Sequence, residues 1–250
     1  MQKVNLRKAI PSFFLVFAAM LHLPFSFAKS SVWEIPALSN EHLAISEELK
    51  TLNASTALYQ NLGLAQMGLS ENAYQYAMAG FEKLKNAGKL SNDHIISIVD
   101  FTKSSAQKRL FVIDMEKAEV LFNTYVAHGQ NSGDAFAKYF SNKPESFQSS
   151  LGFYLTSGTY SGKNGYSMQL IGLERGINDK ADKRAIVMHG APYVNEQMAR
   201  TQGHIGRSWG CPAVPEKLTR PIIDKIKDGS CLFIYANNKN YLKRSVIINS

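Results

Sequence analysis

The sequence predicts a mainly β fold within an α+β chain, in which a β-sandwich or barrel follows a small helical region. Two observations carry this prediction. Residues 31–90 place small and apolar side chains at helical spacing, whereas beyond Asn92 the apolar residues fall in short runs separated by polar links. Several short strands at close spacing, with one helix among them, are typical of sandwiches and barrels.

The first 28 residues have the pattern of a secretory signal peptide. Lys3, Arg7 and Lys8 precede an apolar run that ends in the small residues Ser26 and Ala28, which predicts cleavage after Ala28. Two prolines and a histidine interrupt this run, so no stable transmembrane segment is expected after cleavage. We therefore expect a periplasmic or secreted protein.

The helical region is assigned to residues 29–91. Ser39 is placed to cap a first helix, and Ser70 is placed to cap a second one that stops at Gly88. The second helix repeats small and apolar residues at helical spacing, at Ala73, Ala77, Gly80, Phe81 and Leu84. This pattern indicates a packing face.

Short apolar runs define a β domain, which is assigned to residues 92–237. The predicted strands cover residues 95–101, 109–114, 120–126, 153–156, 167–171, 184–188 and 231–235. One helix is expected from Pro215 to Ile226. Segments 157–166 and 172–179 are predicted to be loops, which carry recognition or simply connect strands, and Tyr160 is a candidate substrate contact there. Residues 238–250 are assigned to a C-terminal tail.

The chain is basic, with a formal net charge of +8. For an exported protein this charge fits an anionic envelope partner such as a wall polymer, although a soluble basic surface is the simpler interpretation. No basic run is interleaved with aromatic residues, so a nucleic-acid partner is not expected.

The two cysteines differ in their surroundings. Cys211 lies in a loop between Gly210 and Pro212, whereas Cys231 lies in a predicted strand. An even pair in an oxidising compartment makes a Cys211–Cys231 disulfide one interpretation. The other is that Cys231 is a small buried hydrophobic residue and that Cys211 is a nucleophile held forward by its backbone.

A cysteine nucleophile needs a base, and six histidines compete for that role. His189 ends a predicted strand and meets Gly190, which favours it, and His204 is a second candidate because it precedes Cys211 by seven residues. A zinc site made of His189, His204 and Cys211 is a less favoured alternative, because these residues lack a compact ligand signature.

The loop around Cys211 offers further functional groups. The backbone amides of Trp209, Gly210 and Cys211 can form an oxyanion hole, because glycine lets amides converge on one point. Arg207 is placed to pair with a substrate carboxylate or to form a surface salt bridge. Trp209 is either a stacking platform or core filler.

Taken together, these residues resemble the YkuD-like murein L,D-transpeptidase catalytic domain family. The resemblance extends from about Ser70 to Tyr235. Its landmarks, specific in their order and spacing, are Ile98–Phe101, Arg109–Asp114, Val126–Gly129, Ser149–Tyr154, His189–Gly190 and Gly206–Val214.

The site loop both matches and departs from the family motif. Ser208, Gly210 and Cys211 match it, whereas Trp209 stands where the family usually has a histidine. The arginine or asparagine usual after the cysteine is replaced by Pro212 and Ala213. The resemblance therefore leaves the nucleophile assigned and the acceptor open.

The resemblance implies a β-sandwich with Cys211 as nucleophile and His189 as base. The implied reaction is acyl transfer from a peptidoglycan tetrapeptide stem through a thioester, to a second stem or an envelope protein, with no metal or organic cofactor. The alternatives are an L,D-carboxypeptidase that uses water as acceptor, an envelope zinc hydrolase, and a non-catalytic wall-binding module with the disulfide.

Overall fold

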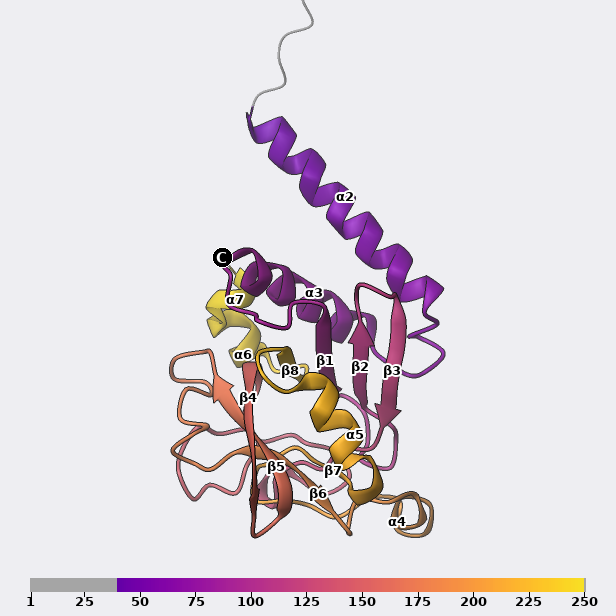
Figure 1. Cartoon of the computed structure of the whole chain (residues 1–250), viewed down its shortest axis with the longest axis vertical. Helices are drawn as coiled ribbons and strands as arrows, with labels where there is room; N and C mark the ends of the chain where they lie inside the picture. Colours follow the sequence, from indigo (N-terminus) through magenta and orange to yellow (C-terminus); the bar gives the residue numbers. More distant parts are fainter. Residues whose placement is uncertain (1–39, 250) are drawn as a thin grey trace, which may run out of the picture. The chain divides into compact units, whose positions relative to one another are not determined.

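The computed structural model describes residues 40–249 (Figure 1). The predicted signal peptide, its cleavage after Ala28 and the Ser39 cap lie outside the described residues. The described part begins with helix α2 (Asn40–Asn61) and helix α3 (Glu71–Asn86). None of its helices combines the length and the apolar character that crossing a membrane requires.

Helix α3 confirms the prediction made from its spacing. Ser70 Oγ accepts a hydrogen bond from the N–H of Ala73 at 3.4 Å and caps the helix. The predicted packing face is buried. Gly80 lies so close to the sheet that a Cβ there would come within 2.0 Å of the Phe153 ring, so a glycine is needed for α3 to dock. Gly88 follows the helix with a φ of +63°, as expected of a C-terminal stop.

Eight strands form one sheet in the order β3-β2-β1-β8-β4-β5-β6-β7. The strands are β1 (Ile95–Asp100), β2 (Leu110–Asp114), β3 (Glu119–Thr124), β4 (Gly152–Gly162), β5 (Gly165–Gly172), β6 (Val187–Ala191), β7 (Ala213–Pro215) and β8 (Cys231–Tyr235). Two neighbouring pairs are parallel, β1 with β8 and β6 with β7. The segment after β3 returns to the opposite edge through a bridge between Ala127 and Ala213, which gives the sheet a barrel-like closure. The predicted fold class is confirmed.

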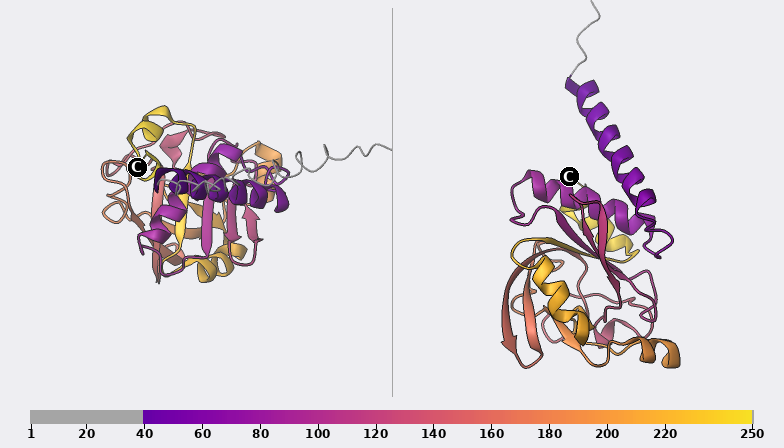
Figure 2. Two further views of the ribbon diagram at one scale, coloured as in Figure 1. Left: turned by 90° about the horizontal axis from the view of Figure 1, so that it is seen from above. Right: turned by 45° about the vertical axis from the view of Figure 1, so that its right-hand side comes forward.

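The core lies on both faces of the central strands. Strands β1 and β8 are buried at every position. Helix α3 covers one side of these strands and helix α5 (Glu216–Ile226) covers the other (Figure 2). Phe153 and Phe233 stack between strands β4 and β8, with ring centroids 4.2 Å apart.

The prediction of a loop at residues 157–166 is wrong. Strands β4 and β5 continue through this segment as one long hairpin, and only Lys163 and Asn164 separate them. The positive φ of Gly165, +73°, makes the tight connection. The outer half of β4 is exposed, so its positions do not need apolar side chains and carry glycine, serine and threonine instead. Loops have the same composition, which is why the sequence predicted one here.

Strand β6 begins at Val187 rather than at residue 184. Ala185 has a φ of +52°, which is outside the extended region and ends the preceding turn. The residues predicted as the start of a strand therefore belong to the turn. Arg184 therefore lies in a turn and not in a strand.

More helices accompany the strands than the single one predicted. Helix α5 is confirmed, but α4 (Glu196–Gln202), the 3-10 helix η2 (Gln130–Ser132), α6 (Lys239–Arg244) and α7 (Val246–Asn249) were not expected. The last two occupy the segment predicted as a tail. Each is too short for apolar periodicity to show. Side-chain caps begin α4 and α6: Asn195 Oδ1 accepts from the N–H of Met198 at 2.8 Å, and Asn238 Oδ1 accepts from the N–H of Tyr241 at 2.9 Å.

Candidate active site

Parallel pairing of β6 with β7 places the predicted histidine beside the strand that follows the predicted cysteine. His189 is aligned with Ala213, and Cys211 precedes Ala213 by two residues. The thiol of Cys211 donates to the carbonyl oxygen of Ala185 at 3.6 Å, just before β6 begins. The thiol and the imidazole are therefore presented by adjacent backbones at one edge of the sheet.

The loop before Cys211 is also held by the segment that follows β3. The N–H of Ser208 donates to the carbonyl oxygen of His128 at 2.9 Å, and the N–H of Gln130 donates to the carbonyl oxygen of Ser208 at 2.7 Å. Two backbone hydrogen bonds at Ser208 thus fix the loop to the segment 128–130.

Ser208 and Gly210 shape the turn that carries Cys211. Ser208 Oγ donates to the carbonyl oxygen of Cys211 at 2.6 Å and accepts from the N–H of Gly210 at 3.0 Å. Gly210 has a φ of +122°, and a Cβ there would lie 2.8 Å from the carbonyl oxygen of Gln148. Both the conformation and the space require glycine.

Of the three amides predicted to form an oxyanion hole, that of Gly210 already has a hydrogen-bond partner. The N–H of Gly210 is occupied by Ser208 Oγ, so it is not available to a substrate. The N–H groups of Trp209 and Cys211 donate to no acceptor within residues 40–249. These two amides, and not that of Gly210, are the donors that the turn leaves open.

The Cys211 thiol is nearly buried, and this burial raises its pKa. Two groups oppose the effect: the backbone N–H of Val187, which donates to the sulfur, and the positive charge of Arg184. Burial is the largest of the three. The thiol therefore rests in its protonated form near neutral pH and needs a base to ionise.

His189 has the protonation state of such a base. Its Nδ1 lies 2.8 Å from the carbonyl oxygen of Gly190, which can only accept, so Nδ1 carries the proton and Nε2 keeps its lone pair. Burial lowers the pKa of the imidazole, which keeps it neutral at neutral pH. Gly190 also allows α5 to approach, because a Cβ there would lie 2.2 Å from Thr219 Oγ1.

Arg184 is a site residue that the sequence analysis missed. It precedes β6, and its charge opposes the rise in the pKa of Cys211 that burial causes. Its two terminal nitrogens each donate twice to one loop: Nη1 to Ser141 O at 2.8 Å and to Ser150 Oγ, and Nη2 to Gln148 O at 2.6 Å and to Ser146 Oγ at 3.3 Å. No carboxylate of the described residues pairs with it. Nothing in the local pattern distinguishes it from the adjacent Lys183.

Tyr193 is a second residue that was missed. The backbone carbonyl of Tyr193 accepts from the N–H of Gly206 at 2.8 Å, and a Cβ on Gly206 would lie 2.5 Å from the Cβ of Tyr193. Burial, and then the charge of Cys211, raise the pKa of its phenol to about 12. The glycine at 206 was a signal of this close approach, although it did not name the partner.

The other candidates differ in their exposure and in the contacts that they make. Trp209 is 67% exposed and contacts Phe147, so it is not core filler. Arg207 pairs with Asp134, the surface salt bridge that was its alternative reading. The remaining two are His204, whose Nδ1 lies 3.0 Å from the carbonyl oxygen of Ile205, and Tyr160, exposed on β4.

Two alternatives drawn from the sequence are wrong. Cys211 and Cys231 are both free, and Cys231 is fully buried in β8. Burial raises the pKa of the Cys231 thiol far above its usual range, which makes it inert. Within the described ranges, no three histidine, cysteine, aspartate or glutamate side chains gather to hold a metal ion, so His189, His204 and Cys211 are not a zinc ligand set.

A buried arginine supports the segment that holds the loop. Arg109 is completely buried and donates from Nε and Nη2 to the carbonyl oxygen of Val126 at 3.1 and 2.9 Å. Its guanidinium also lies 4.7 Å from the centroid of the Phe101 ring. His128 is fully buried beside it.

Comparisons with known proteins find one family model and several solved structures that are similar to part of this chain. A model of the L,D-transpeptidase catalytic domain family matches residues 65–235. No curated protein matches the sequence.

Several solved structures are similar to part of the chain. An L,D-transpeptidase from Mycobacterium smegmatis is 14% identical, with a TM-score of 0.35, and the match covers 57% of this chain and 59% of that one. L,D-transpeptidase 3 from Mycobacterium tuberculosis is 10% identical, with a TM-score of 0.37 and coverages of 57% and 61%. The helical cell shape determining protein Pgp2 from Campylobacter jejuni is 14% identical, with a TM-score of 0.39 and coverages of 68% and 61%. The chain spans less than two thirds of the length of these proteins.

Proposed function

Because the chain belongs to the L,D-transpeptidase catalytic domain family, we propose that it is an exported cysteine acyltransferase that acts on tetrapeptide stems of peptidoglycan. The observation that carries the proposal is the pairing of β6 with β7, which aligns His189 with the strand that follows Cys211. The tautomer of His189 supports it, because Nε2 is left as a proton acceptor.

In the first half-reaction, His189 Nε2 takes the proton of the Cys211 thiol. The thiolate attacks the carbonyl carbon of the third residue of the stem, and the open amides of Trp209 and Cys211 donate to the oxyanion. When the tetrahedral intermediate collapses, the C–N bond to the terminal D-alanine breaks. The leaving amine takes the proton from His189, and a thioester remains on Cys211.

In the second half-reaction, an acceptor attacks the thioester carbonyl. His189 takes a proton from the attacking amine or water, and returns it to the departing Cys211 sulfur, which restores the resting enzyme. An amine of a second stem gives a cross-link, an amine of an envelope protein gives an attached protein, and water gives a shortened stem. Analysis of the muropeptide products identifies which acceptor is used.

Arg184 is proposed as a positioning residue for this chemistry. Four of its five N–H groups are committed to the loop 141–150, so it does not have a free fork for a substrate carboxylate. Its charge, unpaired with any carboxylate of the described residues, instead favours the thiolate of Cys211 over the thiol. It therefore offsets part of the cost of burying the nucleophile.

Mass spectrometry tests the nucleophile directly. The protein is incubated with a tetrapeptide muropeptide or a carbapenem, and the adduct is mapped to a peptide. We expect an adduct at Cys211 that is absent in Cys211→Ala and retained in Cys231→Ala, because Cys231 is fully buried. An unmodified Cys211 in folded protein, or an adduct that survives Cys211→Ala, would contradict the proposal.

A further inference from the structure

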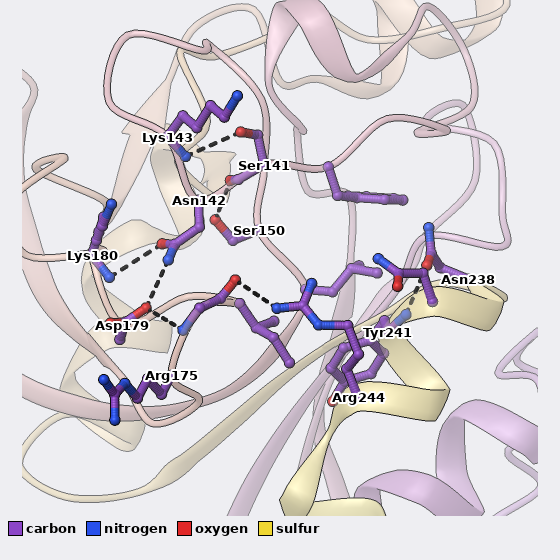
Figure 3. Close-up of a pocket in the computed structure, with 15 residues that line it drawn as sticks. Ser141, Asn142, Lys143, Ser150, Arg175, Asp179, Lys180, Asn238, Tyr241 and Arg244 are labelled. Carbon is purple, nitrogen blue, oxygen red and sulfur yellow. Dashed lines mark hydrogen bonds between the residues drawn. The ribbon is translucent and has the colours of Figure 1, made fainter.

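A pocket of about 460 Å³ is lined in part by Ser141 and Ser150, to which Arg184 donates hydrogen bonds. Three segments line it: residues 140–143 together with 150–151, the turn 175–180, and the region 238–244 around α6. Figure 3 shows Lys143, Lys180 and Asp179 on one side, with Tyr241 and Arg244 facing them. No step of the proposed reaction uses this pocket.

The walls of the pocket are fixed by hydrogen bonds among its own residues. Asn142 Nδ2 and the N–H of Gly176 both donate to Asp179 Oδ1, each at 2.7 Å (Figure 3). Arg244 Nη2 donates to the carbonyl oxygen of Gly176 at 3.3 Å, which ties α6 to the turn. On the α6 side, Tyr241 donates to the buried carboxylate of Glu174 at 3.2 Å. The pocket is therefore formed before any ligand arrives.

The charges around the pocket do not balance. Lys143, Arg175, Lys180 and Arg244 line it, and Asp179 is its one lining carboxylate among the described residues. The two donors described above, rather than a cation, are the main reason that the pKa of Asp179 is lowered. None of the four cations forms an ion pair within the described part of the chain.

Apolar side chains narrow the class of ligand. Phe140, Leu151 and Ile177 also line the pocket. A phosphate polymer offers charge but no apolar group for these side chains, whereas a short peptide with free carboxylates and alanine methyl groups offers both. The combination of surplus cations and apolar lining favours such a peptide.

The pocket shares residues with the proposed catalytic loop. Arg184 Nη1 donates to Ser141 O and Ser150 Oγ, and both of these residues line the pocket. Its other terminal nitrogen, Nη2, lies 3.3 Å from the position that a Cβ on Gly210 would take. A single side chain thus separates the pocket from the turn that carries Cys211.

We propose that this pocket is a second binding site, specific for a short peptide that bears free carboxylates and small apolar side chains. The identification of that peptide as a neighbouring peptidoglycan stem rests on the proposed function. Binding there holds a second strand of the wall beside the enzyme while the first strand reacts at Cys211.

Calorimetric titration tests the proposal with the full chain carrying Cys211→Ala, which binds without turnover. The probe is a soluble tetrapeptide muropeptide, and we expect two binding sites. The double variant Lys143→Glu/Lys180→Glu is expected to weaken one of them by at least about tenfold. Lys217→Glu/Lys225→Glu is the matched control, because it makes the same change in net charge with two exposed lysines of α5, and both sites are expected to remain.

Two further titrations test whether the carboxylates of the peptide or any anion is recognised. The same peptide with its carboxylates amidated is expected to lose the second site. Inorganic phosphate is expected to displace the peptide with unmodified carboxylates only weakly. A single site in the Cys211→Ala protein, equal loss in the control pair, or equally strong displacement by phosphate would overturn the proposal. The Cys211 adduct in the otherwise wild-type chain is measured separately, so failure of the second site and failure of the proposed function are distinguished.

Discussion

Arg109 Nη2 donates to Nδ1 of His128 at 2.8 Å, and both side chains are completely buried. His128 must accept this hydrogen bond, because a guanidinium has no lone pair to offer. Its Nε2 carries the proton and donates to the carbonyl oxygen of Gly133 at 3.1 Å. Since the carbonyl oxygen of His128 accepts from Ser208, a neutral imidazole in the core supports the loop that carries Cys211.

This relationship predicts a pH dependence of stability. Burial and the charge of Arg109 lower the pKa of His128 to about 4, below the value of 6.5 for an unperturbed histidine. The unfolded chain thus binds the proton more readily than the folded one. The contribution of neutral His128 to the free energy of unfolding is complete above pH 6.5 and is lost as the pH falls toward 4. It amounts to about 3 kcal/mol.

Replacement of His128 by glutamine is the test, because glutamine keeps one acceptor and one donor but does not titrate. We expect the free energy of unfolding of wild type to fall by about 3 kcal/mol more than that of His128→Gln between pH 7 and pH 4. Chemical denaturation at several pH values measures this difference. His204→Gln is the control and is expected to follow wild type; parallel curves for wild type and His128→Gln would refute the assignment.

The proposed base predicts a pH profile for acylation. Because burial lowers the pKa of His189, the imidazole is expected to become protonated only below pH 6.5. Acylation is expected to be lost there, since a protonated imidazole cannot accept the thiol proton. The second-order rate of adduct formation at Cys211, measured by mass spectrometry across pH, reports this acid limb. His189→Asn is expected to reduce the rate by about 10²-fold or more and to remove the limb, whereas His204→Gln keeps it. A rate in His189→Asn close to that of wild type would exclude His189 as the base.

The charge of Arg184 predicts a change in the reactivity of the thiol. Burial raises the pKa of Cys211, and the charge of Arg184 offsets part of this rise; Arg184→Met removes that charge, so alkylation by iodoacetamide at pH 8 is expected to slow by about tenfold. Arg184→Lys keeps the charge and is expected to recover most of the rate, although it loses the four hydrogen bonds to the loop. Arg175→Met removes a charge from the pocket rim and serves as control. Equal alkylation profiles for Arg184→Met and wild type would show that the charge does not act on the thiol.

The sequence predicted the features that arise from local patterns. The Ser70 cap and the α3 packing face follow from spacing within one helix, and the burial of Cys231 follows from its apolar neighbours. The β4–β5 hairpin was missed because an exposed strand can carry the same glycine and serine residues as a loop. Arg184 and Tyr193 were missed for another reason: each meets the Cys211 loop only through tertiary contacts, which no local pattern records.

Gly210 offers the sharpest test of how the Cys211 turn is built. Its φ of +122° disfavours any residue with a side chain, and a Cβ would lie 2.8 Å from the carbonyl oxygen of Gln148, which is backbone and cannot rotate away. Gly210→Ala is therefore expected to cost about 1–3 kcal/mol of stability and to displace the adjacent nucleophile. Gly158→Ala is the matched control, because a Cβ there meets nothing within 4 Å and its φ is not in the left-handed region.

Thermal unfolding and adduct formation are measured together on both variants. We expect Gly158→Ala to resemble wild type in both, and Gly210→Ala to lose acylation even at temperatures where it remains folded. If Gly210→Ala keeps both its stability and its rate of adduct formation, the turn tolerates a side chain, and the geometry of the open Cys211 amide does not depend on glycine at position 210.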